Sequence, residues 1–138
     1  MSYISRDEQL LLKIRKNIQK LKLLFIKIEP LSDMEIDEGI EGLAITQCVT
    51  NLFELSSRIV DENIAQRLSL LSSGRTARMR NISSHDYDAV DWSIAKNNCR
   101  NILRNITNEL LDDCITKILQ KKQDIKDYTH SAKHSKKR

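Results

Sequence analysis

The feature that most constrains the fold of this chain is an apolar stripe near its N-terminus. Large apolar residues recur there at alternating spacings of three and four, namely Leu11, Ile14, Ile18, Leu21, Phe25 and Ile28. Residues at these spacings share one face of an α-helix, so the pattern predicts a long helix whose stripe faces a core. Ser5 and Glu8 have the spacing of a capping box at its start, and Pro30 is expected to end it.

Glycine and proline are too rare for an all-β fold. The 138 residues include three Gly and one Pro, whereas a β-sandwich needs frequent turns built from these residues. Two further stripes follow a connection at residues 31–42: Ile45, Cys48, Leu52, Leu55 and Ile59, and later Cys99, Ile102, Ile106, Leu110, Ile115, Ile118 and Leu119. We therefore predict an all-α protein, an antiparallel helical bundle of about four main helices plus a short helix.

Several polar residues mark the expected helix boundaries. Residues 64–71 are predicted to form the short helix, which Ser72-Ser73-Gly74 would end, and a further helix is expected to begin near Arg75. Asp91 is the predicted N-cap of the last long helix, and a bend is expected near Asn108, where the phase of the stripe drifts.

The charge of the chain is concentrated at its C-terminus. Residues 121–138 contain seven basic and two acidic residues, a net charge of +5, so residues 1–120 carry −1 of the total of +4. Apolar periodicity fades past Gln120. We therefore predict a helical domain at residues 1–120 and a basic, disordered tail at residues 121–138. Such a lysine-rich end most often only solvates the chain, and the alternative is that it adds non-specific affinity for RNA.

The cysteines and the N-terminus indicate the compartment. Cys48, Cys99 and Cys114 are odd in number, lie within helical patterns, and show no C-x-x-C spacing. Buried free thiols in a reducing cytosol are favoured over disulfides or a zinc site. The N-terminus lacks the pattern of a signal peptide, and no apolar run approaches membrane length. We expect a cytoplasmic protein with no membrane association, no metal and no cofactor.

The only dense polar group lies at residues 75–88. It contains Arg75, Arg78, Arg80 and Asn81, followed by Ser83, Ser84, His85 and Tyr87. A neutral imidazole can remove the proton from a ribose 2′-hydroxyl, while a guanidinium stabilises charge on the phosphoryl oxygens. Asn81 lies four residues before His85 and would share its face of a helix, where it can orient the imidazole.

The same residues also have a purely structural interpretation. By spacing alone, Arg80 can form a salt bridge and His85 can cap the C-terminus of a helix. On one ideal helix, residues five apart point about 140° from each other. A helix end near His85, or a second subunit, would be needed to bring Arg80 and His85 to one phosphate.

The sequence from Arg80 to Tyr87 resembles the R-x4-H-x-Y signature of the HepT-like family of the HEPN superfamily. The resemblance extends over roughly residues 6–119 and implies a small HEPN-like helical bundle that forms a two-fold homodimer. It implies a toxin of a toxin–antitoxin pair, an endoribonuclease encoded beside a minimal nucleotidyltransferase antitoxin. Arg80 and His85 would be the catalytic pair, and Tyr87 would be the tyrosine that the antitoxin modifies with AMP.

Around this pair we predict supporting roles for Asn81 and Ser84, and contacts from Arg75 and Arg78 to RNA phosphates. The expected partners are RNA, the nucleotidyltransferase and a second copy of the chain. The alternative is a non-catalytic helical partner that binds a nucleotidyltransferase or a nucleotide through the same surface.

Overall fold

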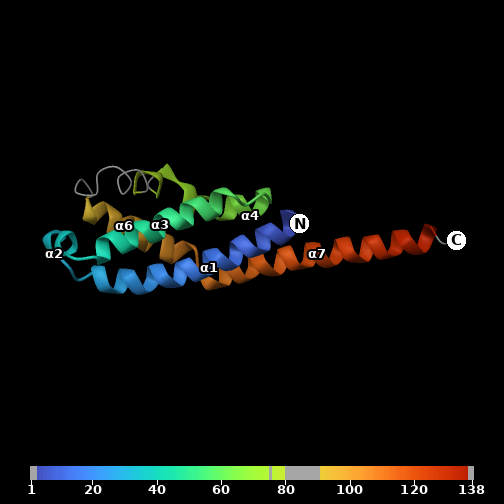
Figure 1. Ribbon diagram of the computed structural model, residues 1–138, viewed down its shortest axis with the longest axis horizontal. Helices are drawn as coiled ribbons and strands as arrows, with labels where there is room; N and C mark the ends of the chain where they lie inside the picture. Colours follow the sequence, from blue (N-terminus) through green and yellow to red (C-terminus); the bar gives the residue numbers. More distant parts are fainter. Residues whose placement is uncertain (1–2, 75, 80–90, 137–138) are drawn as a thin grey trace.

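The computed structural model describes residues 3–74, 76–79 and 91–136, with side chains described as far as residue 129 (Figure 1). Within these residues there is no strand, so the predicted all-α class is confirmed. Four helices are long: α1 (Tyr3–Ile28), α3 (Glu41–Ser57), α6 (Trp92–Asn105) and α7 (Asn108–Lys136). The shorter elements are α2 (Asp33–Glu38), α4 (Glu62–Arg67) and the 3-10 helix η1 (Ser69–Ser72).

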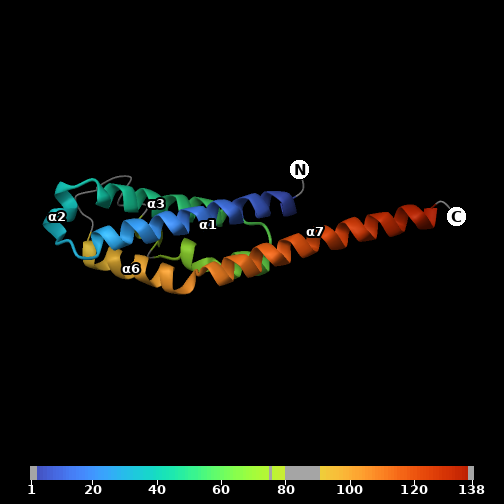
Figure 2. The same cartoon turned by 90° about the horizontal axis from the view of Figure 1, so that it is seen from below.

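Helix α1 lies at the centre of the bundle. It packs against α3, α6 and α7, and it runs opposite to all three (Figures 1 and 2). All six residues of the predicted stripe are buried: Leu11, Ile14, Ile18, Leu21, Phe25 and Ile28. Burying this stripe on three neighbouring helices supplies most of the stability of α1, because a water-exposed helix gains little from propensity alone.

The capping box that the sequence predicted at Ser5 and Glu8 is wrong. Helix α1 already includes Tyr3, so Ser5 lies inside the helix, and the Glu8 carboxylate accepts a hydrogen bond from Lys122 Nζ at 2.7 Å. A capping box forms instead at Ser32 and Glu35, where each side chain accepts from the other residue's backbone N–H. This box starts α2 within residues 31–42, which the sequence predicted to be a connection.

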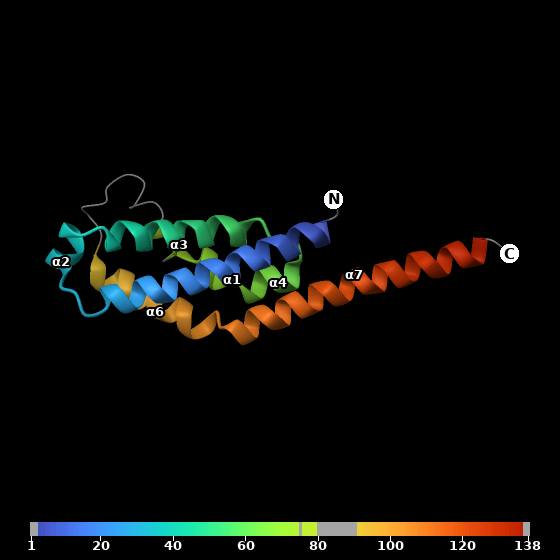
Figure 3. The same ribbon diagram turned by 60° about the horizontal axis from the view of Figure 1, so that its bottom comes forward.

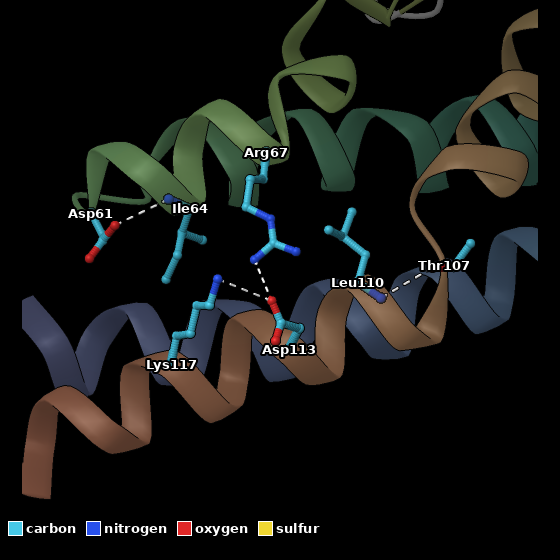
Figure 4. A network of polar contacts seen from close by, with 7 residues as sticks. All are labelled: Asp61, Ile64, Arg67, Thr107, Leu110, Asp113 and Lys117. Carbon is cyan, nitrogen blue, oxygen red and sulfur yellow. Dashed lines mark hydrogen bonds and ion pairs between the residues drawn. The ribbon is translucent and has the colours of Figure 1, made fainter.

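Helix α3 presents its predicted stripe to the core. Ile45, Cys48 and Leu52 are buried, Leu55 packs partly buried against them, and Ile59 is buried just beyond the end of the helix. The short helix predicted after it is present as two pieces, α4 and η1. Asp61 caps α4, since its Oδ1 accepts from the Ile64 N–H at 3.1 Å (Figure 4).

The last predicted helix is divided where the bend was expected. Helix α6 ends at Asn105, and Thr107 Oγ1 accepts from the Leu110 N–H at 3.1 Å at the start of α7 (Figure 4). The division changes the phase of the stripe, so the fully buried residues of α7 are Leu111, Cys114 and Ile118. Leu110 and Ile115 are only partly buried, and the expectation that Leu119 faces the core is wrong because it is 45% exposed.

A polar network fixes α4 on α7. Arg67 Nη1 lies 2.7 Å from Asp113 Oδ2, and Lys117 Nζ lies 3.4 Å from the same oxygen (Figure 4). These two cations lower the pKa of Asp113. They keep the carboxylate charged where the two helices meet.

A second polar contact joins α1, the start of α4 and α7. Asp7 is fully buried, and its two carboxylate oxygens accept from the backbone N–H groups of Val60 at 3.0 Å and Asp61 at 2.8 Å. The Asp61 carboxylate in turn pairs with Lys121, which lowers the pKa of Asp61. The connection before α4 is therefore held by charged groups from both sides.

The tail predicted as disordered from residue 121 is wrong as far as residue 136, because α7 continues to Lys136. Lys121 and Lys122 bind Asp61 and Glu8 of the bundle, which extends the ordered surface past Gln120. Beyond them, side-chain amides support the helix at the spacing of one turn: Gln120 donates to Asp124 and Gln123 to Asp127. This distal part projects beyond the N-terminal end of α1 (Figure 3).

The three cysteines are free and buried, as the sequence predicted. Burial raises the pKa of the Cys48 thiol to about 11 and that of Cys99 to about 12. In the part of the chain that the structure describes, no helix is both long and apolar enough to cross a membrane.

Candidate functional site

Most of the predicted site residues fall within residues 80–90, and two described segments flank this range. On the N-terminal side, Gly74 and residues 76–79 are helical, as expected for a helix beginning near Arg75. The Ala77 N–H donates to the Ser73 carbonyl at 2.9 Å, and the Thr76 hydroxyl donates to the Leu70 carbonyl at 3.1 Å. Thr76 is fully buried, so these contacts attach the segment to η1.

Met79 attaches the same segment to α6. Its side chain is 4% exposed, and Asn98 Nδ2 donates to its sulfur at 3.0 Å. Asn98 is itself fully buried, and its Oδ1 accepts no hydrogen bond within the described residues. Burying an amide oxygen without a hydrogen-bond donor costs free energy. The Asn98 Oδ1 is therefore an acceptor available next to Met79, the residue that precedes Arg80.

On the C-terminal side, Asp91 begins α6 as the sequence predicted. Its Oδ1 accepts from the backbone N–H groups of Ser93 at 3.0 Å and Ile94 at 3.2 Å. Trp92 is 1% exposed, and its Nε1 donates to Asp37 Oδ1 of α2 at 2.6 Å. The cap and the buried indole fix the end of the segment against α2 and the core.

The described residues on either side of residues 80–90 are both held by α6. Met79 contacts Asn98, and Trp92 lies six residues earlier on α6, which corresponds to about 9 Å along the axis. Met79 and Trp92 thus give the two described segments that flank the motif fixed positions on α6.

The structure tests few of the predicted site residues directly. Arg78 is described, and it is exposed on the helical segment 76–79. The others lie outside the described residues: Arg75, Arg80, Asn81, Ser84, His85 and Tyr87. Their predicted roles stay predictions.

Two surface hollows lie elsewhere, where α1 meets the junction of α6 and α7. One, of about 370 Å³, is lined mainly by apolar side chains that include Phe25, Ile26 and Leu103. The other, of about 440 Å³, is lined by polar side chains that include Arg15, Gln19 and Asp112. None of the predicted site residues lines either hollow.

The described residues contain no group of three or more His, Cys, Asp or Glu side chains placed to hold a metal ion. Comparison with protein-family models, with curated proteins and with solved structures finds no match.

Sequence reasoning missed two residues at the edge of the site. Asn98 occupies the buried face of α6 together with Ala95, Cys99 and Ile102, and a polar residue within an apolar stripe is the signal that could have identified it. Asp37 lies in the predicted connection at residues 31–42, and no sequence pattern links it to Trp92, which is 55 residues away.

Proposed function

We propose that this chain is a HepT-like endoribonuclease toxin that cleaves RNA without a metal ion. The observation that carries the proposal is the sequence Arg80-Asn-Ile-Ser-Ser-His-Asp-Tyr87, which follows Met79 and precedes Asp91, two residues anchored on α6. The all-α bundle supports it as a suitable scaffold, although helical bundles serve many functions.

In this mechanism His85 acts as the general base. Its neutral imidazole takes the proton from a ribose 2′-hydroxyl, whose oxygen then attacks the adjacent phosphorus. The bond from phosphorus to the 5′-oxygen breaks, which leaves a 2′,3′-cyclic phosphate and, after protonation, a 5′-hydroxyl. Arg80 stabilises the charge on the phosphoryl oxygens, and Arg75 and Arg78 bind neighbouring phosphates. Asn81 and Ser84 support the pair.

In this proposal a partner enzyme controls the activity by modifying Tyr87. A minimal nucleotidyltransferase antitoxin would transfer AMP from ATP to the Tyr87 oxygen, with release of pyrophosphate. Only Asp86 separates Tyr87 from His85, so the added phosphate would lie close to the catalytic pair, where Arg80, Arg78 or Arg75 would bind it. We place this toxin–antitoxin pair in the cytoplasm and the toxin in a homodimer.

Cleavage of total RNA by the purified full-length chain in excess EDTA tests the proposal. Wild type is expected to cleave, and Arg80→Ala and His85→Ala to lose at least a hundredfold in rate, in line with the usual contribution of a general base. His134→Ala is a matched control, because it removes another histidine outside the motif and should keep full activity. Equal rates in all four proteins would contradict the proposal.

A second experiment separates a toxin from a non-catalytic binding partner. After incubation with the nucleotidyltransferase and ATP, wild type should gain the mass of one AMP and lose activity. Tyr87→Phe should gain no mass and keep cleaving RNA. A chain that binds the nucleotidyltransferase but shows no cleavage before or after incubation would instead support the non-catalytic alternative.

A further inference from the structure

Helix α1 has a second row of residues on its outer face, apart from the stripe that the bundle buries. The row repeats at alternating spacings of four and three and consists of Leu12, Lys16, Gln19, Leu23 and Ile26. All five residues are exposed, and the three aliphatic ones, at positions 12, 23 and 26, are 38%, 64% and 61% exposed. We call these five residues the outer seam of α1. Aliphatic side chains that stay exposed in one line along a helix mark a contact face for a partner.

The outer seam has the layout of a coiled-coil heptad. Leu12, Gln19 and Ile26 take the d positions, and Lys16 and Leu23 take the a positions. The e positions on one flank are all lysine: Lys13, Lys20 and Lys27. The g positions on the other flank are Arg15, Lys22 and Glu29. Because charges at e and g decide which helix pairs with such a seam, these flanks favour an acidic partner.

The positive charge of the flanks is largely not neutralised within the described part of the chain. Residues 9–28 contain six basic residues and no acidic one. Of the six, Arg15 pairs with Asp112, with Nη1 at 2.5 Å from Oδ1, whereas no described residue forms an ion pair with any of the five lysines. Glu29, the acidic residue at a g position, has its Oε1 at 3.5 Å from Arg100 Nη2. A second copy of the chain would place lysine against lysine at this seam, which disfavours self-pairing.

The two surface hollows open beside the outer seam. Gln19 and Ile26 line the apolar hollow of about 370 Å³ together with Leu103 of α6. Leu12, Lys16 and Gln19 line the polar hollow of about 440 Å³. Because Gln19 lines both, the hollows follow each other along α1. Side chains that project from a docked helix can enter such depressions, as in the recognition of a helix by a groove.

We propose that the outer seam binds an acidic amphipathic helix of another protein. From Leu12 to Ile26 the seam is about 21 Å long, which is the length of two heptads. The partner helix would place leucine-like side chains against Leu23 and Ile26, and carboxylates against the lysines on both flanks. A further carboxylate opposite Lys16 would set the register, since a single charged residue at an a position has this effect.

The composition of the seam favours this occupant over two other anionic ones. Proteins that bind single-stranded RNA stack its bases on aromatic side chains, and the outer seam has no aromatic residue. A helix that lies on a membrane buries a wide apolar face, whereas Lys16 and Gln19 interrupt the apolar residues here. The proposal goes beyond the ribonuclease function and does not depend on it, because the binding is measured without RNA.

Fluorescence polarisation with a labelled three-heptad peptide tests this contact. The probe has leucine at every a and d position and glutamate at every e and g position, and a control peptide has lysine at e and g instead. The full chain is expected to bind the acidic peptide with a dissociation constant below about 100 μM. It should bind the basic peptide at least tenfold more weakly.

Two matched pairs of serine substitutions locate the binding. Leu23→Ser with Ile26→Ser should raise the dissociation constant of the acidic peptide at least tenfold. Met34→Ser with Ile40→Ser removes similarly exposed aliphatic side chains outside α1 and should leave the constant unchanged. Because all four side chains are exposed, circular dichroism should show the helix content of the wild type in both variants.

Charge reversal identifies the partner's chemistry. Lys13→Glu with Lys20→Glu and Lys27→Glu should reverse the preference, so that the basic peptide binds more tightly than the acidic one. Lys126→Glu on α7 is the control and should leave the preference unchanged.

Three results with the peptides would overturn the proposal: no binding of the acidic peptide at about 100 μM, equal affinity for the two peptides, or binding that the changes in the outer seam leave unaltered. Single-stranded RNA and phosphatidylglycerol vesicles serve as competing ligands. If either binds more tightly than the acidic peptide and loses affinity in Leu23→Ser with Ile26→Ser, the seam belongs to nucleic acid or to a membrane, and the proposal is also overturned.

Discussion

The first half of α7 buries an apolar stripe, whereas the second half has only two large apolar side chains, Ile125 and Tyr128, and both are exposed. In the first half, Ile118 is fully buried against the bundle, and Arg67 and Lys121 tie the helix to its neighbours through Asp113 and Asp61. In the second half, Ile125 is 54% exposed. The comparison shows that periodicity specifies which face of a helix is apolar, whereas the length of the neighbouring helices decides how much of that face is covered.

The largest expected contrast is between Ile118 and Ile125. Ile118→Ala leaves a cavity in the core and should lower the free energy of unfolding by about 3 kcal/mol. Ile125→Ala removes the same atoms from an exposed site and should change it by less than about 0.5 kcal/mol. Urea denaturation of both variants at a concentration that keeps the chain monomeric measures the difference. Equal losses of unfolding free energy would show that the second half of α7 packs on the bundle of its own chain.

A smaller effect on the free energy of unfolding is expected from the ion pair between Asp61 and Lys121, which lies near the boundary between the two halves of α7. Lys121 lowers the pKa of Asp61, so the folded state keeps Asp61 charged at a pH where the unfolded chain begins to bind a proton. The stabilisation is therefore complete well above the unfolded pKa of about 3.9 and is lost as the pH falls through the folded value.

Asp61→Asn keeps an N-cap for α4 but removes the charge, and it should cost about 1 kcal/mol at pH 7. The difference from wild type should shrink as the pH falls below about 4. Asp124→Asn in the second half of α7 is the control and should change the free energy of unfolding by less than about 0.5 kcal/mol at either pH. A pH-independent loss in Asp61→Asn would show that the ion pair with Lys121 does not contribute.

The smallest effect is expected from removing residues 129–138. In the monomer these residues follow the exposed Tyr128, so the melting temperature should change by less than about 2 °C. Thermal unfolding followed by circular dichroism measures it. A drop of 5 °C or more would mean that the end of the chain contributes to the folded core.

The sequence predicted well those features that depend on nearby residues. The stripe of α1, the N-cap at Asp91 and the interruption near Asn108 each follow from residues within a few turns, and the structure confirms all three. The capping box at Ser5 failed because Ser5 lies within α1, whose helix already includes Tyr3. The continuation of α7 was missed because its first support past Gln120 comes from Asp61 and Glu8, which are distant in the sequence.

The candidate site could be predicted only as a motif. Arg80 and His85 are recognisable by type and spacing, but the contacts that hold the described residues on either side of them are long-range. Met79 meets Asn98 across 19 residues, and Trp92 meets Asp37 across 55. Such pairs depend on how helices pack, and a single sequence carries no local signal for them.

The ends of the RNA fragments test the central claim most directly. Mass spectrometry of a short RNA incubated with the full chain in EDTA identifies the chemical groups at the new ends. We predict 2′,3′-cyclic phosphate and 5′-hydroxyl ends, because a base at His85 makes the ribose 2′-oxygen the nucleophile. These ends should disappear in His85→Ala and persist in His134→Ala. New ends with 3′-hydroxyl and 5′-phosphate groups, or no cleavage by wild type, would contradict the account.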